Sequence, residues 1–158
     1  MKKTLKTYDV LIIGAGPAGA NAAISYKNLN PSLTVGLVDK AIFPRDKSCG
    51  DAIGPGVISA LKRFNNEHIL DGEPQVVSTT LYGPDNIGIQ NYIPEVKNKE
   101  DSIVYVIPRI DLDNRILNLA KESGVDVYEG YSFVDFTSNE DRSLNIQIKN
   151  DNENLELL

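Results

Sequence analysis

The sequence Gly14-Ala-Gly16-Pro-Ala-Gly19 stands directly between an apolar run and a stretch of helix-forming residues. Glycines at these three positions serve separate purposes. Gly14 permits a tight turn after a strand, Gly16 lets the backbone approach a pyrophosphate, and Gly19 lets a helix pack closely on the strand. The pattern therefore predicts a strand, a turn and a helix whose first N–H groups bind the phosphates of a dinucleotide.

An acidic residue follows this motif at the distance that a dinucleotide-binding β-α-β unit requires. Residues 33–38 form a second apolar run, which predicts a strand, and Asp39 stands at its end. We expect the Asp39 carboxylate to accept hydrogen bonds from the hydroxyls of an adenosine ribose and to repel a 2′-phosphate. An ordinary glycine turn before a helix is the alternative. Lys40 is a further cofactor-binding candidate, with a solvated lysine as its alternative.

The rest of the sequence predicts an α/β chain in which antiparallel strands follow the first unit. Residues 40–55 are rich in Gly, Pro and charge, which is typical of a long functional loop, and residues 65–74 predict a polar connection. The predicted helices are 17–28, 57–64 and 111–123, and the predicted strands are 8–13, 33–38, 76–82, 87–93, 103–107, 125–128, 131–136, 144–148 and the segment from 155.

Charge and cysteine content argue against several classes of function. A net charge of −6 in 158 residues disfavours a nucleic-acid partner, which needs clustered Lys and Arg. No apolar stretch approaches the length of a transmembrane helix. A single cysteine allows no intrachain disulfide, which fits a cytoplasmic location. His68, the only histidine, has polar neighbours and is expected at the surface, and no metal site is recognisable.

Two further positions have both a functional and an ordinary interpretation. Cys49 lies on the predicted loop beside Lys47, where its thiol could have a lowered pKa, although composition alone favours a small, apolar residue. Arg109 lies between a predicted strand and a predicted helix. It is either a surface arginine paired with a nearby aspartate or a guanidinium near the nucleotide phosphates. Arg45 and Lys47 are either ordinary loop charges or part of the same site.

The glycine motif, Asp39, the loop around Cys49 and the segment around Arg109, in this order and spacing, resemble the geranylgeranyl reductase family of FAD-dependent oxidoreductases. This family has the para-hydroxybenzoate hydroxylase fold. The resemblance implies a Rossmann-like FAD-binding domain, an isoprenoid or lipid-like substrate, and NADPH or reduced ferredoxin as the electron donor. The glycine motif is common to many flavoproteins, whereas the Lys-x-Cys-Gly loop is more specific. The matching segments are Gly14 to Gly19, Asp39, Phe43-Pro-Arg-Asp-Lys-Ser-Cys-Gly-Asp51 and Val106-Ile-Pro-Arg-Ile-Asp-Leu-Asp113.

The resemblance also implies roles for single residues. Asp39 would bind the ribose of FAD, and Lys40 remains a candidate beside it. The pyrophosphate would be held by the backbone around Gly16 to Ala18. The cofactor-binding residues of the whole motif would be Gly14, Gly16, Pro17, Ala18 and Gly19.

The flavin end of the cofactor would lie against the loop that contains the cysteine. Cys49, Gly50 and Ala52 would line the flavin, with Cys49 as the candidate catalytic residue. Arg109 would lie near the ribityl and phosphate groups, and the backbone of Val134 would meet the adenine.

The predicted domain organisation is interrupted. Residues 1–74 would form the FAD-binding β-α-β unit and the cofactor loop, 75–107 the start of an inserted antiparallel substrate domain, and 108–158 the return to the FAD-binding domain. The family's second flavin motif is absent from the sequence, so we expect an N-terminal fragment or a truncated gene product. Peripheral membrane contact would then come through the missing part. The alternatives are an FAD-dependent monooxygenase of the same fold acting on an aromatic substrate, and a non-catalytic nucleotide-binding remnant.

Overall fold

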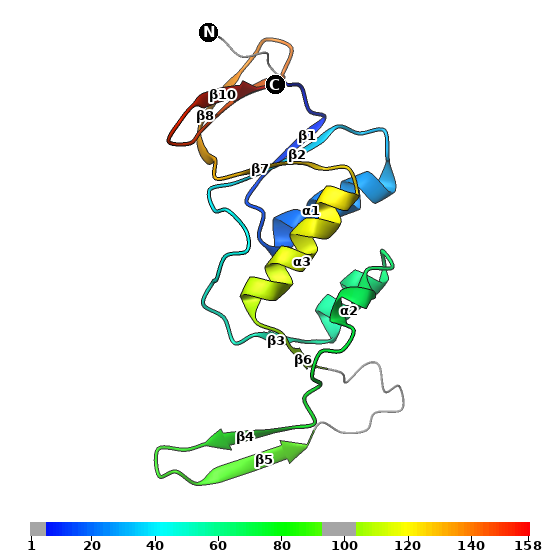
Figure 1. Cartoon of the computed structure of the whole chain (residues 1–158), viewed down its shortest axis with the longest axis vertical. Helices are drawn as coiled ribbons and strands as arrows, with labels where there is room; N and C mark the ends of the chain where they lie inside the picture. Colours follow the sequence, from blue (N-terminus) through cyan, green and yellow to red (C-terminus); the bar gives the residue numbers. More distant parts are fainter. Residues whose placement is uncertain (1–5, 93–103) are drawn as a thin grey trace. The chain divides into compact units, whose positions relative to one another are not determined.

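The computed structural model describes residues 6–92 and 104–158, which pack as two units (Figure 1). The first unit consists of Met1–Lys47 and Ile110–Leu158. The second unit is Ser48–Arg109. Ile93 and Ile103, each at the end of a predicted strand, lie outside the described residues.

A parallel sheet forms the centre of the first unit. Its strands are β1 (Val10–Ile13), β2 (Val35–Asp39) and β7 (Asp126–Glu129), in the order β1-β2-β7. The helix α1 (Pro17–Leu29) connects β1 to β2, so the predicted β-α-β unit is confirmed. The first four residues of β2 are buried, as expected for the central strand of a parallel sheet.

The helix α3 (Arg109–Glu122) precedes β7 and begins two residues earlier than its apolar spacing predicts. The predicted inner face is confirmed, because Leu112, Ile116 and Leu119 are buried. The polar Asp113 is buried on the same helix and is only 1% exposed. In Figure 1 the parallel sheet lies between the two helices α1 and α3 and a second sheet.

This second sheet is antiparallel, with strands β8 (Ser132–Ser138), β9 (Leu144–Lys149) and β10 (Asn154–Leu157) and with β9 in the middle. Tyr8 donates its N–H to the carbonyl of Leu158 at 2.6 Å, alongside the end of this sheet.

The predicted strand over residues 8–13 is therefore wrong in its first part. Tyr8 pairs beside the antiparallel sheet, whereas β1 of the parallel sheet begins at Val10. The chain changes sheets at Asp9, whose carboxylate accepts hydrogen bonds from the backbone N–H and the hydroxyl of Thr34. The core between the two sheets contains Tyr8, Val38, Ile148 and Leu157.

The second unit contains short elements that the sequence pattern did not reveal. The strands β3 (Ala52–Ile53) and β6 (Tyr105–Val106) pair antiparallel. The prediction of an irregular segment over residues 40–55 is therefore wrong at its end. A two-residue strand has no readable period, and its partner lies far along the chain.

Two helical elements also differ from the prediction. The helix α2 (Pro55–Lys62) begins two residues earlier, because proline is favoured at the first helical position. The predicted polar connection contains the 3-10 helix η1 (Glu67–Leu70), which buries Ile69 and Leu70. The polar residues on both sides of these two apolar side chains concealed this small buried segment.

The predicted hairpin is present as β4 (Ser78–Tyr82) and β5 (Gly88–Tyr92), paired antiparallel with Leu81 opposite Ile89. Val76 and Val77 precede the strand rather than belonging to it. Large apolar side chains of the hairpin remain exposed, among them Leu81, Tyr82, Ile89 and Tyr92.

Candidate functional site

The glycine motif forms a turn that other residues would not tolerate. Gly14 has a φ of +104°, a conformation that L side chains rarely adopt. A Cβ on Gly19 would lie 1.8 Å from the carbonyl oxygen of Gly14. Both glycines are therefore required for α1 to start so close to the end of β1.

The amino terminus of α1 presents backbone donors to this turn. Gly16 is the N-cap and offers no side chain, and the first intrahelical bond runs from the N–H of Ala20 to the carbonyl of Gly16 at 3.0 Å. Pro17 has no N–H, and those of Ala18 and Gly19 have no acceptor within the helix. Such donors, together with the helix dipole, suit an anion such as a phosphate.

Asp39 links the end of β2 to the glycine turn. Its Oδ2 accepts the N–H of Ala15 at 2.7 Å, and its Oδ1 accepts the N–H of Ala41 at 2.8 Å. Each carboxylate oxygen retains a lone pair after accepting one bond, so ribose hydroxyls can still donate to it.

A pocket of about 310 Å³ lies beside this carboxylate. It brings together the ends of β1 and β2 with the start of β8. Lys40 lines it with an otherwise exposed side chain, whereas Val134 lies further along β8 and is 45% exposed. The lining residues are Ile13, Gly14, Val38, Asp39, Lys40, Tyr131, Ser132 and Phe133.

Arg45 is a residue of the site whose role the sequence left open. Its Nη1 donates to the Oδ2 of Asp113 at 2.8 Å, and its guanidinium carbon lies 4.9 Å from the centre of the Phe43 ring. Its Nη2 would be 3.5 Å from a Cβ placed on Gly16. The guanidinium is therefore held at the glycine turn, next to the donors at the start of α1. The only signal in the sequence was an aspartate on the apolar face of a helix.

The candidate flavin-side residues lie in the second unit, where the pairing of β3 with β6 brings the cysteine loop to Arg109. Asp51, which has a φ of +56°, accepts the N–H of Ile107 through its carbonyl at 2.9 Å and the N–H of Arg109 through its Oδ1 at 3.3 Å. Gly50 precedes it in the exposed loop, and Ala52 begins β3.

Cys49 is exposed and carries a free thiol. The backbone N–H of Asp51 lowers the pKa of this thiol most strongly, and a hydrogen bond from the Arg109 side chain lowers it further. Both contacts stabilise the deprotonated thiol relative to that of an ordinary cysteine. His68 is exposed, as the sequence predicts.

Sequence comparison relates the chain to several reductases. It is 33% identical over 129 residues to a menaquinone reductase of Mycolicibacterium smegmatis, covering 82% of this chain and 30% of the relative. It is 30% identical over 123 residues to a digeranylgeranylglycerophospholipid reductase of Picrophilus torridus, covering 77% of this chain and 29% of the relative. The resemblance to the geranylgeranyl reductase family is thereby confirmed. No protein-family model matches the chain.

Solved structures share the fold. A geranylgeranyl bacteriochlorophyll reductase-like protein of Thermoplasma acidophilum superposes with a TM-score of 0.77 at 22% identity, covering 98% of this chain and 38% of that one. The p-nitrophenol 4-monooxygenase of Pseudomonas putida has a TM-score of 0.81 at 13% identity, covering 97% of this chain and 39% of that one. The fold is therefore that of Rossmann-like flavoproteins.

The chain spans about 30% of the length of the curated relatives it matches. Among the helices in residues 6–92 and 104–158, none has the length and apolar character needed to cross a membrane.

Proposed function

We propose that the first unit binds FAD and that the chain is the FAD-binding part of a flavin oxidoreductase that reduces isoprenoid carbon–carbon double bonds. The observation that carries the proposal is the position of Asp39. Its carboxylate is bonded to the glycine turn through Ala15 and lines a pocket together with Gly14. A ribose in this pocket would place its attached phosphates toward the start of α1.

In this proposal, different residues of the first unit bind different parts of the cofactor. The N–H groups of Ala18 and Gly19 and the guanidinium of Arg45 hold the pyrophosphate. Asp39 accepts the ribose hydroxyls, with Lys40 beside it. The adenine meets the start of β8, where Ser132 and Phe133 line the pocket and the predicted contact Val134 follows.

The residues for the flavin side are assigned from the family resemblance. We assign Cys49, Gly50 and Ala52 to the flavin and Arg109 to its ribityl and phosphate groups. FAD, when bound, supplies the hydride chemistry. Arg109 stabilises the Cys49 thiolate by a hydrogen bond. A negative charge on Cys49 would raise the energy of a second negative charge nearby. The protonation state of Cys49 would therefore affect how readily such a charge forms.

The names of the relatives support the substrate class. Digeranylgeranylglycerophospholipid and menaquinone are both lipids with isoprenoid chains, and both relatives are named reductases. We therefore propose an isoprenoid lipid as the substrate of the whole enzyme, and NADPH or reduced ferredoxin as the electron donor. A cytoplasmic location and the three-part division at residues 74 and 107 stay predictions.

An FAD-dependent monooxygenase is the second candidate, because the fold is shared with p-nitrophenol 4-monooxygenase. Rapid mixing of the reduced enzyme with oxygen separates the two. A hydroxylase accumulates an oxygenated flavin species with its own absorbance band, whereas a reductase need not.

Binding of four nucleotides to the purified chain tests the cofactor proposal. We expect FAD and ADP to bind in competition, FMN to bind at least about tenfold more weakly because it has no adenosine, and adenosine 2′,5′-bisphosphate to be disfavoured by the charge of Asp39. FAD fluorescence quenching and calorimetry give the affinities. A chain that binds neither FAD nor ADP would contradict the proposal, whereas a chain that binds ADP but not FAD would favour the non-catalytic nucleotide-binding remnant.

Variants at Asp39 assign the contact. Asp39→Ala should weaken FAD and ADP binding by about tenfold or more. Asp39→Asn, which keeps a carbonyl acceptor for one of the two backbone N–H groups, guards against simple unfolding. Glu140→Ala removes an exposed carboxylate of the same unit and should leave both affinities unchanged.

A further inference from the structure

We infer that Tyr131 is a positioning residue of the cofactor pocket, because its backbone holds Asp39 while its hydroxyl is bonded to Glu153 in the β9–β10 turn. Binding of a nucleotide at Asp39 and ordering of this turn are then coupled through one side chain. The inference rests on the proposed function, in which Asp39 accepts the ribose hydroxyls of FAD.

The backbone of Gly130 and Tyr131 extends the pairing between β2 and β7 beyond the ends of both strands. Asp39 lies opposite Glu129 in the last register pair of these strands. Beyond this pair, Tyr131 donates its N–H to the carbonyl of Asp39 at 3.0 Å. Gly130 donates its N–H to the carbonyl of Ala41, also at 3.0 Å. The direction of the Asp39 carboxylate depends on this segment, because its Oδ1 accepts the N–H of Ala41.

The side chain of Tyr131 is held at its far end. Its hydroxyl donates to Oε1 of Glu153 at 2.5 Å. This bond is the largest of the causes that raise the pKa of the hydroxyl, which therefore stays protonated and serves as the donor. The ring packs edge-on against that of Tyr128, with the ring centres 5.9 Å apart at an angle of 87°. Tyr131 also lines the pocket beside Asp39.

The acceptor Glu153 belongs to a turn with its own hydrogen bonds. Between β9 and β10, the Oδ1 of Asn150 accepts the N–H groups of Asn152 and Glu153, each at 2.8 Å. The N–H of Asn150 donates back to the carbonyl of Glu153 at 3.0 Å. A hydrogen bond to a carboxylate is stronger than one between neutral groups. The bond from Tyr131 therefore connects the position of this turn to the wall of the cofactor pocket.

This connection has a thermodynamic consequence. Ribose hydroxyls bonded to Asp39 would restrain the residue whose carbonyl accepts the N–H of Tyr131, and a restrained Tyr131 would in turn restrain Glu153. Coupling between two sites is reciprocal, so loss of the contact with Glu153 should weaken nucleotide binding as well. A tyrosine that only packs between the two sheets would affect the stability of the fold without connecting these two sites.

Calorimetry and amide hydrogen exchange of the chain with ADP test the inference. We expect saturating ADP to slow exchange at the N–H of Glu153 by about threefold or more in the wild-type chain. Tyr131→Phe keeps the ring and removes the hydroxyl. This variant should bind ADP about fivefold more weakly and lose the slowing at Glu153. ADP should still slow exchange at the N–H of residue 131, because that group is bonded to Asp39.

Variants of Glu153 test the same bond while Tyr131 is unchanged. Glu153→Ala should reproduce the loss of ADP affinity. Glu153→Gln keeps a carbonyl oxygen that can accept the hydroxyl, so it should recover most of the affinity. This pair of variants decides the question even if Tyr131→Phe does not fold.

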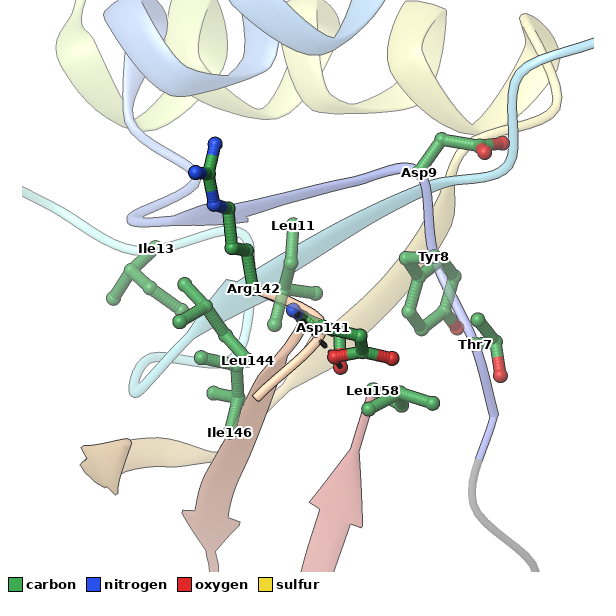
Figure 2. A pocket seen from close by; sticks show the side chains of 11 residues that line it. Thr7, Tyr8, Asp9, Leu11, Ile13, Asp141, Arg142, Leu144, Ile146 and Leu158 are labelled. Carbon is green, nitrogen blue, oxygen red and sulfur yellow. Dashed lines mark hydrogen bonds between the residues drawn. The ribbon is translucent and has the colours of Figure 1, made fainter. Parts of the chain in front are cut away.

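Tyr8→Phe is the matched control, because it also removes the hydroxyl of a partly enclosed tyrosine. The hydroxyl of Tyr8 lies 2.7 Å from that of Tyr128. Tyr8 lines a different pocket, of about 410 Å³, which Figure 2 shows. The control variant should therefore keep both the ADP affinity and the slowing at Glu153.

The possible results separate the inference from the proposed function. Unchanged ADP affinity in Tyr131→Phe, or slowing at Glu153 that persists in this variant, would overturn the inference alone. Equal losses in Tyr131→Phe and Tyr8→Phe would also overturn it, because they would indicate a general loss of packing. A wild-type chain that binds neither ADP nor FAD would contradict the proposed function and the inference with it.

Discussion

Arg45 and Asp113 join the loop after β2 to the inner face of α3 through a hydrogen bond of 2.8 Å. The Asp113 side chain is fully buried, whereas the Arg45 side chain is 20% exposed. Asp113 thus fixes Nη1 of the guanidinium, while Nη2 lies at the glycine turn, 3.5 Å from where a Cβ on Gly16 would be. In the proposed function, this pair positions the arginine that would bind the pyrophosphate.

Removing either partner should cost stability. Arg45→Met leaves a buried carboxylate without this bond and should lower the free energy of unfolding by about 1.5–3 kcal/mol. The double variant Arg45→Met/Asp113→Leu should lose less than the sum of the single variants, because it leaves no buried carboxylate deprived of the Arg45 bond. Urea denaturation of the four proteins measures the coupling, and strict additivity would contradict it.

The thiol of Cys49 should react at lower pH than an ordinary cysteine. Its pKa is lowered by the backbone N–H of Asp51 and by Arg109, so the rate of alkylation by iodoacetamide should rise at a lower pH in the folded than in the denatured chain. It is the only cysteine, so the reaction reports on one site.

Arg109→Gln separates the two causes of this shift. The midpoint of alkylation should move up, yet remain below that of the denatured chain, because the N–H of Asp51 is the larger contributor. Lys47→Gln removes a nearby loop charge as the control. An equal shift in both variants would indicate a general charge effect instead of the specific hydrogen bond.

Gly19 should be irreplaceable while another helical glycine is not. Gly19→Ala forces a Cβ against the carbonyl of Gly14 and should lower the free energy of unfolding by about 1–3 kcal/mol and weaken FAD binding. Gly56→Ala in α2 meets no atom within 4 Å and should raise stability by about 0.5–1 kcal/mol. Denaturant melts and FAD titrations of both variants test this difference, and equal stability of the two variants would contradict it.

Asp9 should titrate below the ordinary range of an aspartate. The backbone N–H and then the hydroxyl of Thr34 lower its pKa. A carboxyl whose folded pKa is lowered contributes stability above its unfolded pKa and loses that contribution as the pH falls through the folded pKa.

Thr34→Val removes the hydroxyl and keeps the N–H. The pKa of Asp9 should therefore rise only part of the way to its ordinary value. The control is Asp141, whose pKa is lowered by the hydroxyl and then the backbone N–H of Ser143 and should not change. Carboxyl-carbon NMR titration measures both groups, and a complete return of Asp9 to its ordinary value would contradict the ranking.

The first β-α-β unit was readable from the sequence because all its determinants are local. Glycine spacing, a proline at the first helical position and two apolar runs lie within residues 10–39, and the structure has β1, α1 and β2 there. The switch of Tyr8 into the other sheet was not readable. Its partner is Leu158, at the opposite end of the chain, and no local period records such a pairing.

The residues of the candidate site also differ in how far the sequence predicted them. Asp39 was found because its distance from the glycine motif is fixed by the length of one helix. The role of Arg45 was left open, because its position depends on the hydrogen bond to Asp113, which stands 68 residues away on another element. A charged residue on the buried face of a predicted helix is a usable signal, since it needs a partner of opposite charge.

The strand order β1-β2-β7 also determines when each strand can pair during synthesis of the chain. β1, α1 and β2 leave the ribosome early, but the second neighbour of β2 begins at Asp126, after the whole of Ser48–Arg109 and α3 have been made. One side of β2 must therefore stay unpaired while the residues between Asp39 and Asp126 are made. Non-local pairing of this kind is slow and exposes an aggregation-prone strand to the cell. A nascent chain of this protein is expected to depend on chaperones until β7 has emerged.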